Sequence, residues 1–392
     1  MMFLQYCVPG ALLPILSLYL KDRLHFAPFQ VGEILAIPAM AAFVAPVIAA
    51  SIADRIISAE RFLALSHFLG AGLMLWLSYQ TSFGSFLLVY LAYALLFTPT
   101  SALTNTVTFH HAEDAKRDFS PIRLWGTAGW FAVGWVFGYF WVRNGGSGAE
   151  ASRLPDAFKL SALCSLLVAA YALTLPRSHV ITAKAAFAPW KGWRTFTRPS
   201  LLLLCALTFF NVVVNQFYLY GISPYLSHIG FRDQYIMPAM SLGQLTEIGA
   251  MAYLGRFLSR FGLKSALIIG AGVQLVRSAT LAWGGPDAVI LCAVALHGIC
   301  YTFFFAVAFI YVDQHSARGE RASAQQLFAV IFSGVGTLAG SLLAGKVAEA
   351  LAARGSGAIN YTGFWMVPAL LSVLVTLLLA LFFREEPAPR AT

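Results

Sequence analysis

Residues 201–222 read LLLLCALTFFNVVVNQFYLYGI, a run without one charged side chain. A helix needs about 20 predominantly apolar residues to cross the hydrocarbon core of a bilayer, so this run is long enough to span a membrane. Eleven further apolar runs of similar length, separated by charged or helix-breaking residues, occur at 2–20, 31–53, 62–79, 83–106, 121–142, 158–175, 235–254, 263–283, 288–312, 322–344 and 361–383. The sequence therefore predicts an all-α integral membrane protein with twelve transmembrane helices.

The composition excludes other classes of protein. Of the 392 residues, 59% are hydrophobic and 11% are charged, against about 25% charged in an ordinary soluble domain. Neither a water-soluble enzyme nor a disordered chain, which is poor in hydrophobic residues, has this composition. The formal net charge of +9 comes from basic residues between the apolar runs, so the predicted partner is a lipid bilayer and not a nucleic acid. The first apolar run has no basic leader and no cleavage site, and we expect it to remain in the mature protein.

The basic residues are distributed unevenly. Seventeen lie at the two ends and in the even-numbered connections, eight lie in or beside the odd-numbered connections, and Arg277 lies within an apolar run. Because cytoplasmic loops carry the excess of Lys and Arg, both termini are predicted to be cytoplasmic. The predicted location is the plasma membrane, which in a bacterium is the inner membrane.

The longest connection divides the chain. Residues 176–200 carry five basic residues and no acidic residue, which predicts a six-helix half at 1–176, a cytoplasmic linker at 177–199 and a second six-helix half at 200–392. The tripeptide Phe-Ala-Val at 131–133 recurs at 328–330. Arg123 and Arg321 open corresponding runs 198 residues apart. Such repeats indicate a duplicated architecture, with two halves related by pseudo-twofold symmetry.

Little in the sequence points to catalysis or metal binding. The five cysteines fall inside apolar runs without CxxC or Cys/His spacing, so we expect buried apolar side chains and predict no metal site and no cofactor. No GxxxxGK[ST] motif supports ATP-driven transport. A membrane enzyme would need a catalytic cluster at one membrane face, and the only polar cluster of that kind lacks a recognisable spacing, so no enzymatic activity is predicted. This cluster consists of His110, His111, Glu113, Asp114 and Asp118.

Two connections contain a charge pattern. Asp54 and Arg55 follow the second apolar run, and residues 255–264 (GRFLSRFGLK) follow the eighth. Both resemble the signature loops of the major facilitator superfamily, which implies a cytoplasmic gate that includes Asp54, Arg55 and Arg260. The alternative is that any cytoplasmic loop is basic.

Three motifs carry a closer resemblance. Residues 121–130 (PIRLWGTAGW), 243–247 (GQLTE) and 321–325 (RASAQ) resemble motifs of the nucleoside:proton symporter family within that superfamily. The short segments LQYC at 4–7, NT at 105–106 and GKV at 345–347 are similar too. The resemblance implies a secondary transporter that moves a nucleoside inward with a proton by alternating access. The alternative cargo for the same fold is a sugar or another small polar solute.

Glu247 is notable on physical grounds alone. It lies about 12 residues into an apolar run, and about 18 Å along a helix that rises 1.5 Å per residue. Carboxylates are costly in hydrocarbon and are retained mainly in cavities and proton relays. A carboxyl group there favours its neutral form and can exchange a proton when water reaches it. Glu247 is therefore the predicted proton-coupling residue, and the alternative is a neutral acid that bonds to a neighbouring helix.

The resemblance also implies a set of solute-binding residues. Two positions depart from the family pattern, because Leu219 replaces an expected asparagine and Thr302 an acidic residue, which leaves the solute open. Gly126 and Gly129 are expected to allow close helix packing, and Arg277 to pair with a carboxylate or to pack between helices. Amides such as Asn211 and Asn215 suit a hydroxyl-rich or base-bearing solute, or hydrogen bonds between helices. The predicted solute-binding residues are Arg123, Thr127, Trp130, Gln216, Gln244, Glu247, His297 and Tyr301.

Overall fold

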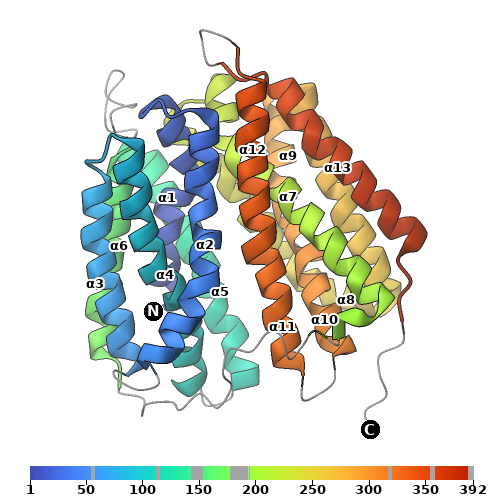
Figure 1. Ribbon diagram of the computed structural model, residues 1–392, viewed down its shortest axis with the longest axis horizontal. Coiled ribbons are helices and arrows are strands. Elements are labelled where there is room, and N and C mark those ends of the chain that lie inside the picture. Colours follow the sequence, from blue (N-terminus) through green and yellow to red (C-terminus); the bar gives the residue numbers. More distant parts are fainter. Residues whose placement is uncertain are drawn as a thin grey trace. The chain divides into compact units, whose positions relative to one another are not determined.

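The computed structural model describes residues 1–53, 58–111, 115–142, 153–176, 193, 195–316, 320–353 and 358–386. Within these residues the chain consists of helices and their connections (Figure 1). The only β-type pairing in the described part is one isolated bridge between Ala352 and Ile359. The predicted all-α class is confirmed.

The helices follow the apolar runs closely. Several extend beyond them, because polar residues at the ends of a run can continue a helix as it leaves the membrane. The first six-helix group comprises α1 (Met2–Asp22), α2 (Pro28–Ala53), α3 (Ala59–Leu77), α4 (Phe83–His111), α5 (Ala115–Trp135) with the π-helical η1 (Val136–Val142), and α6 (Asp156–Thr174). The remainder comprises α7 (Pro199–His228), α8 (Asp233–Trp283), α9 (Asp287–Cys300), η5 (Tyr301–Ala306), α10 (Val307–His315), α11 (Arg321–Ala329), η6 (Val330–Gly336), α12 (Thr337–Ala350) and α13 (Tyr361–Phe382).

Within the residues described above, eight helical segments are long and apolar enough to cross a membrane. One of them, α8, consists of two helices that meet at Gly262, where φ is 78°. Glycine adopts this conformation without the steric cost of a Cβ. The connection expected at 255–264 is corrected by the structure: residues 255–261 stay helical, because they contain no proline and Gly255 is tolerated within a helix, and the bend is confined to Gly262. The chain is a multi-pass membrane protein, and twelve spans remain a prediction.

The chain forms two compact units. Unit 1 contains Met1–Ala186 and Ile222–Pro238, and unit 2 contains Phe187–Gly221 and Ala239–Thr392. One contact of the segment Ile222–Pro238 with the rest of unit 1 is a 3.0 Å hydrogen bond between the hydroxyls of Ser223 and Ser17. The division into halves at 176 and 200 stays a prediction.

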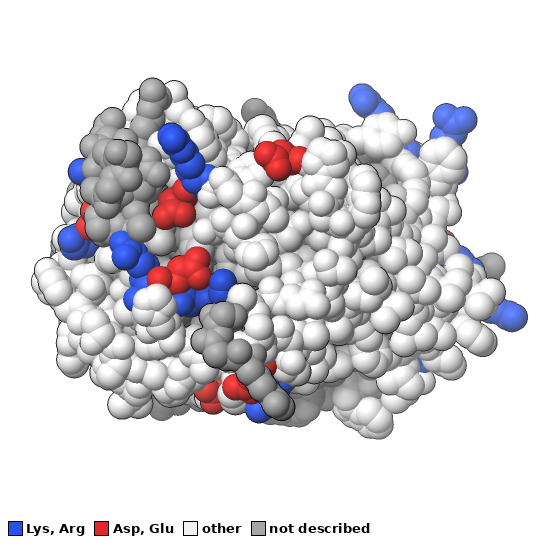
Figure 2. Space-filling model, turned by 90° about the horizontal axis from the view of Figure 1, so that it is seen from above, with Lys and Arg blue, Asp and Glu red and all other residues white. Residues whose placement is uncertain are grey.

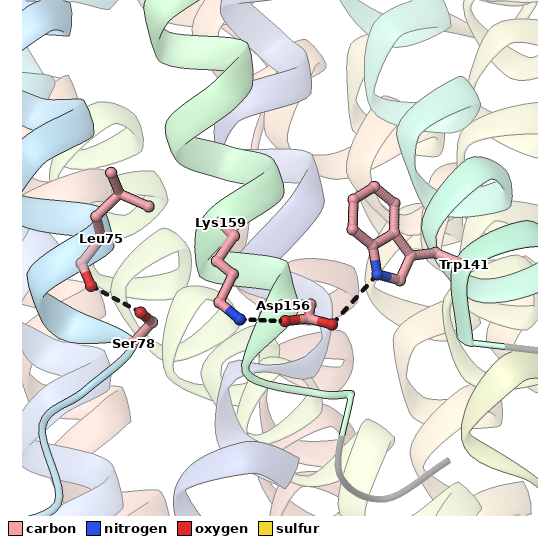
Figure 3. A network of polar contacts seen from close by, with 5 residues as sticks. All are labelled: Leu75, Ser78, Trp141, Asp156 and Lys159. Atoms are coloured by element: carbon pink, nitrogen blue, oxygen red, sulfur yellow. Dashed lines mark hydrogen bonds and ion pairs between the residues drawn. The ribbon is translucent and has the colours of Figure 1, made fainter. Parts of the chain in front are cut away.

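In unit 1, α1 packs against α5 and α6, and α3 packs against α4 and α6. A polar network ties the end of η1 to the start of α6 (Figure 3). The Asp156 carboxylate accepts hydrogen bonds from Lys159 at 2.7 Å and from the Trp141 indole at 3.3 Å, while Ser78 Oγ caps α3 by donating to the Leu75 carbonyl at 2.7 Å. Amphipathic Trp and Lys side chains are typical of helix ends at the membrane surface.

Unit 2 has an aromatic core. Phe304, Phe305 and Phe328 are buried together with Tyr311 and Phe383, so side chains of η5, α10, α11 and α13 share one apolar cluster. Their mutual edge-to-face geometry, as between Phe309 and Phe328 at 4.9 Å, is favourable for aromatic rings.

The surface is apolar where helices are exposed. Leu88, Leu173 and Leu381 are 66%, 69% and 69% exposed. Exposed apolar side chains of this kind suit contact with lipid chains, and they would be a liability in water. Figure 2, drawn from above the view of Figure 1, shows that the charged side chains on that face gather in places among uncharged residues.

Candidate solute-binding and proton-coupling site

Arg123 lies on α5, eight residues after the helix begins at Ala115. Its guanidinium carbon stands 4.1 Å from the centre of the Tyr6 ring on α1. A cation over an aromatic face is attracted by the ring quadrupole, by about 0.5 to 2 kcal/mol. The Arg123 side chain therefore packs on Tyr6 of α1 within unit 1. Its position near a helix end would also have allowed it to extend into water.

Close contact between α1 and α5 depends on glycine. A Cβ on Gly129 would overlap the Phe3 carbonyl oxygen, and a Cβ on Gly126 would lie 2.7 Å from the Tyr6 ring. The packing role predicted for these glycines is confirmed. The same contact fixes the face of α5 that carries Thr127 and Trp130, both of which are partly exposed.

The two helices that carry Glu247 and His297 also touch through glycine. A Cβ on Gly298 of α9 would overlap the Gly243 carbonyl oxygen and the Glu247 backbone nitrogen of α8. The Thr246 hydroxyl donates across the same contact to the Ala295 carbonyl oxygen. The Glu247 backbone is therefore packed against α9, and its side chain is partly buried.

His297 of α9 contacts two other helices of unit 2. Its ring stacks on Tyr218 of α7, with centroids 4.8 Å apart and planes 13° apart. Its Nδ1 lies 2.8 Å from Nη1 of Arg277. The Arg277 carbon also stands 4.2 Å from the Tyr218 ring centre. Arg277 thus joins α7, α8 and α9, which supports the packing interpretation of this residue.

Gln216 makes hydrogen bonds with α12. Its amide nitrogen donates to Thr337 Oγ1 at 3.3 Å, and its amide oxygen accepts from Ser341 Oγ at 3.4 Å. Gly340 leaves room for this side chain. The alternative that the amides of α7 form hydrogen bonds between helices is therefore supported at Gln216. Both bonds are long, so a solute could replace them at little cost.

Gln244 can bond to its own helix, whereas the side chain of Tyr301 is exposed. When the Gln244 amide is oriented so that its nitrogen donates, it bonds to the Met240 and Ser241 carbonyl oxygens of its own helix at 3.2 Å. Tyr301 is 36% exposed and opens the π-helical segment η5. Such segments often mark functional positions.

The predicted gate is described only in part. Asp54 and Arg55 lie outside the described residues, as do the side chains of the 110–118 cluster. Arg260 is exposed, with its guanidinium carbon 5.3 Å from the Phe261 ring centre. Beyond Gly262, the Lys264 backbone nitrogen donates to Glu385 at 3.2 Å, which ties this bend to the residues that follow α13.

Some predicted residues have other surroundings. Cys7, Cys164, Cys205 and Cys300 are buried as expected, but Cys292, which lies on α9, is exposed. Gln325, the last residue of the RASAQ motif, donates to the Phe309 carbonyl at 2.9 Å and joins α11 to α10.

Unit 1 contains a buried polar network that was not predicted from the sequence. His67 of α3 lies 2.7 Å from the Gln5 amide oxygen, and the Gln5 amide nitrogen donates to Thr100 at 2.8 Å. All three side chains are buried. The LQYC motif contained a signal for it, because an amide in an apolar run requires buried partners.

The eight predicted residues thus divide between the units. Arg123, Thr127 and Trp130 lie on α5 in unit 1, and the other five lie on α7, α8, α9 and η5 in unit 2. An all-α multi-pass chain with a carboxyl group and polar side chains inside apolar helices has the features of a secondary membrane transporter. Comparison with known proteins identifies the family: the model for the nucleoside H+ symporters matches residues 1–388, and the chain belongs to this family.

Similar proteins support the same conclusion. YegT of Escherichia coli is 31% identical over 98% of this chain and 93% of its own length. The xanthosine permease of Escherichia coli is 28% identical over 99% and 96%. The crystal structure of the nucleoside transporter NupG matches the fold with a TM-score of 0.86 at 24% identity, covering 98% of both chains. The predictions of a major facilitator fold and of a proton-coupled nucleoside transporter are confirmed at the level of the family.

Proposed function

We propose that this chain takes up nucleosides across the bacterial inner membrane together with protons, with both termini in the cytoplasm. Family membership supports the cargo class and the coupling ion, and the bias in basic residues supports the orientation. The observation that carries the proposal on this chain is Glu247, a partly buried carboxyl group on an apolar helix, fixed against α9 at Gly298.

Glu247 carries the coupled proton in this proposal. A carboxyl group within the membrane is neutral when shielded and releases its proton when water reaches it. Alternation of that access between the two sides of the membrane couples proton movement to solute movement.

The aromatic and amide residues bind the solute. Trp130 and Tyr301 each offer a partly exposed ring to a nucleobase, and aromatic stacking on a base is worth about 1 to 3 kcal/mol. Gln216 and Gln244 offer amides to the base edge or to the ribose hydroxyls. Arg123 and Thr127, on the same helix as Trp130, supply further donors.

Uptake into proteoliposomes tests this function. The purified protein is reconstituted, an inward proton gradient is imposed, and accumulation is measured for purine and pyrimidine nucleosides, the free bases, ribose and a disaccharide. The expected result is accumulation of at least one nucleoside, abolished by a protonophore. Accumulation of the sugar in place of every nucleoside would establish the alternative cargo, and uptake that survives the protonophore would refute coupling to protons.

A further inference from the structure

Arg277 is a buried cation within an apolar helix. The residue is 1% exposed, and its guanidinium has one hydrogen-bond partner among the described residues, Nδ1 of His297 at 2.8 Å. Its Nε and Nη2 atoms are buried without a protein acceptor in the part of the chain that the structure describes. The hydrogen bond to His297 is thus the main polar contact described for this charge.

The chemistry of the pair determines the protonation of His297. A guanidinium has only N–H donors and keeps its proton at any physiological pH. At a separation of 2.8 Å, the Nδ1 atom must therefore present a lone pair to Arg277. A neutral imidazole with a lone pair on Nδ1 carries its proton on Nε2, so His297 is a hydrogen-bond donor through Nε2.

The ring is also fixed in orientation. Tyr218 covers one face at 4.8 Å, and the Cβ of His297 would lie 3.3 Å from a Cβ placed on Gly243. Among the described residues, Arg277 and Tyr218 contact the ring. The Cys300 thiol, one turn after His297, interacts electrostatically with both of them, and Glu247 follows Gly243 by one turn of α8. Of these, Arg277 touches the ring nitrogen directly.

We propose that Arg277 is a positioning residue that holds His297 as the Nε2-protonated neutral imidazole, and that His297 thereby donates a hydrogen bond to an acceptor atom of the solute. The acceptor class is a carbonyl oxygen or an unprotonated ring nitrogen of a nucleobase. His297 is held neutral by its neighbour, so it does not carry the coupled proton. The solute part of this inference rests on the proposed function, whereas the assignment of the proton on His297 does not.

Nitrogen NMR tests the tautomer without any solute. Protein labelled with ¹⁵N-histidine is reconstituted in lipid, and the His297 signals are those that vanish in His297→Gln. The expected wild-type spectrum shows an unprotonated Nδ1 and a protonated Nε2 from pH 5 to pH 8. Arg277→Lys keeps a donor and should retain this pattern, whereas Arg277→Met should give mixed tautomers or protonation at the acid end.

A protonated Nδ1 in the wild type would overturn the proposal. The same holds if a folded Arg277→Met variant keeps the wild-type spectrum. Thermal denaturation and size exclusion report whether each variant is folded, and if Arg277→Met fails to fold, the wild-type and Arg277→Lys spectra decide. Because no solute is present, failure here is separate from failure of nucleoside transport.

Binding measurements test the role in recognition. Arg277→Met should weaken nucleoside affinity about tenfold when His297 is present, a coupling of about 1.4 kcal/mol. In the His297→Gln background the amide donates by itself, so the same change should have little effect. Equal losses in both backgrounds would show that Arg277 acts only through packing and would refute the positioning role.

Discussion

Gly298 of α9 lies so close to Glu247 of α8 that a single added Cβ would overlap the Glu247 backbone nitrogen. The predicted coupling carboxyl group is therefore attached at a close contact between these two helices. The proposed roles in solute binding and proton exchange and the observed helix packing involve neighbouring residues here, and separate substitutions can distinguish them.

Glu247→Gln keeps the size and hydrogen bonding of the side chain and removes its titration. We expect concentrative uptake under a proton gradient to be lost, while solute binding or exchange persists. The matched control is Glu349→Gln, because Glu349 is exposed and pairs with Lys346 at 3.5 Å. Accumulation against a gradient by the Glu247→Gln protein would mean that the proton uses another residue.

Gly298→Ala tests the packing. The added methyl group must push α8 and α9 apart, and overpacking costs about 1 to 3 kcal/mol, so we expect a lower denaturation temperature in detergent and slower transport. Gly249→Ala on α8 is the control, because nothing lies within 4 Å of its added Cβ and alanine favours a helix over glycine by about 1 kcal/mol. If both variants have the same stability, the contact is not as tight as described.

Trp130→Ala tests base stacking. We expect nucleoside affinity to fall about tenfold, or about 1.4 kcal/mol, with little change in the denaturation temperature. Trp125 lies on the same helix, is 62% exposed and packs edge-on to Phe3, so Trp125→Ala should leave affinity unchanged. Isothermal titration of both folded proteins decides the matter, and a purely packing role would lower stability and spare affinity.

Gln216→Ala separates binding from the bond to α12. Loss of the hydrogen bonds should cost about 1 kcal/mol of stability, and loss of a solute contact should add about a tenfold drop in affinity. Thr337→Val removes one of these hydrogen bonds from the other side. If Gln216 only joins the helices, the two variants will show similar stabilities and unaltered affinity.

Topology is tested by cysteine labelling in cells. Cys292 is exposed, so it is first replaced by alanine. Single cysteines are then placed at Lys191 and Arg232. An impermeant thiol reagent should label the cysteine at position 232 in intact cells and the cysteine at position 191 only after permeabilisation. The reverse pattern would show that the predicted orientation is wrong.

The helices could be predicted because each is marked by its own apolar run. Several contacts between site residues could not be predicted in this way. An apolar run of spanning length identifies a membrane helix wherever it lies, as at residues 201–222. The bond from Arg277 to His297 joins residues on different helices, and only their packing brings the two atoms together. From the sequence, Arg277 was equally suited to a carboxylate partner.

Other elements depend on backbone detail that hydropathy does not encode. The π-helical segments η1 and η6 follow α5 and α11, the two helices whose Phe-Ala-Val repeats correspond, but no residue pattern marked the change in hydrogen bonding. The continuation of α8 up to Gly262 was not predicted, because charged residues such as Arg256 and Arg260 are typical of a loop between membrane helices. They are equally compatible with a helix that continues outside the bilayer.

The division of α7 and α8 between the two compact units has a mechanical consequence. Unit 2 ends at Gly221 and unit 1 resumes at Ile222 within one continuous helix, and unit 1 ends again at Pro238 inside the next. Pro238 lacks the N–H that would complete the helical turn before it, so α8 has one backbone hydrogen bond fewer where unit 1 ends, nine residues before Glu247. A helix that lacks this bond resists bending at that turn less than an intact helix does.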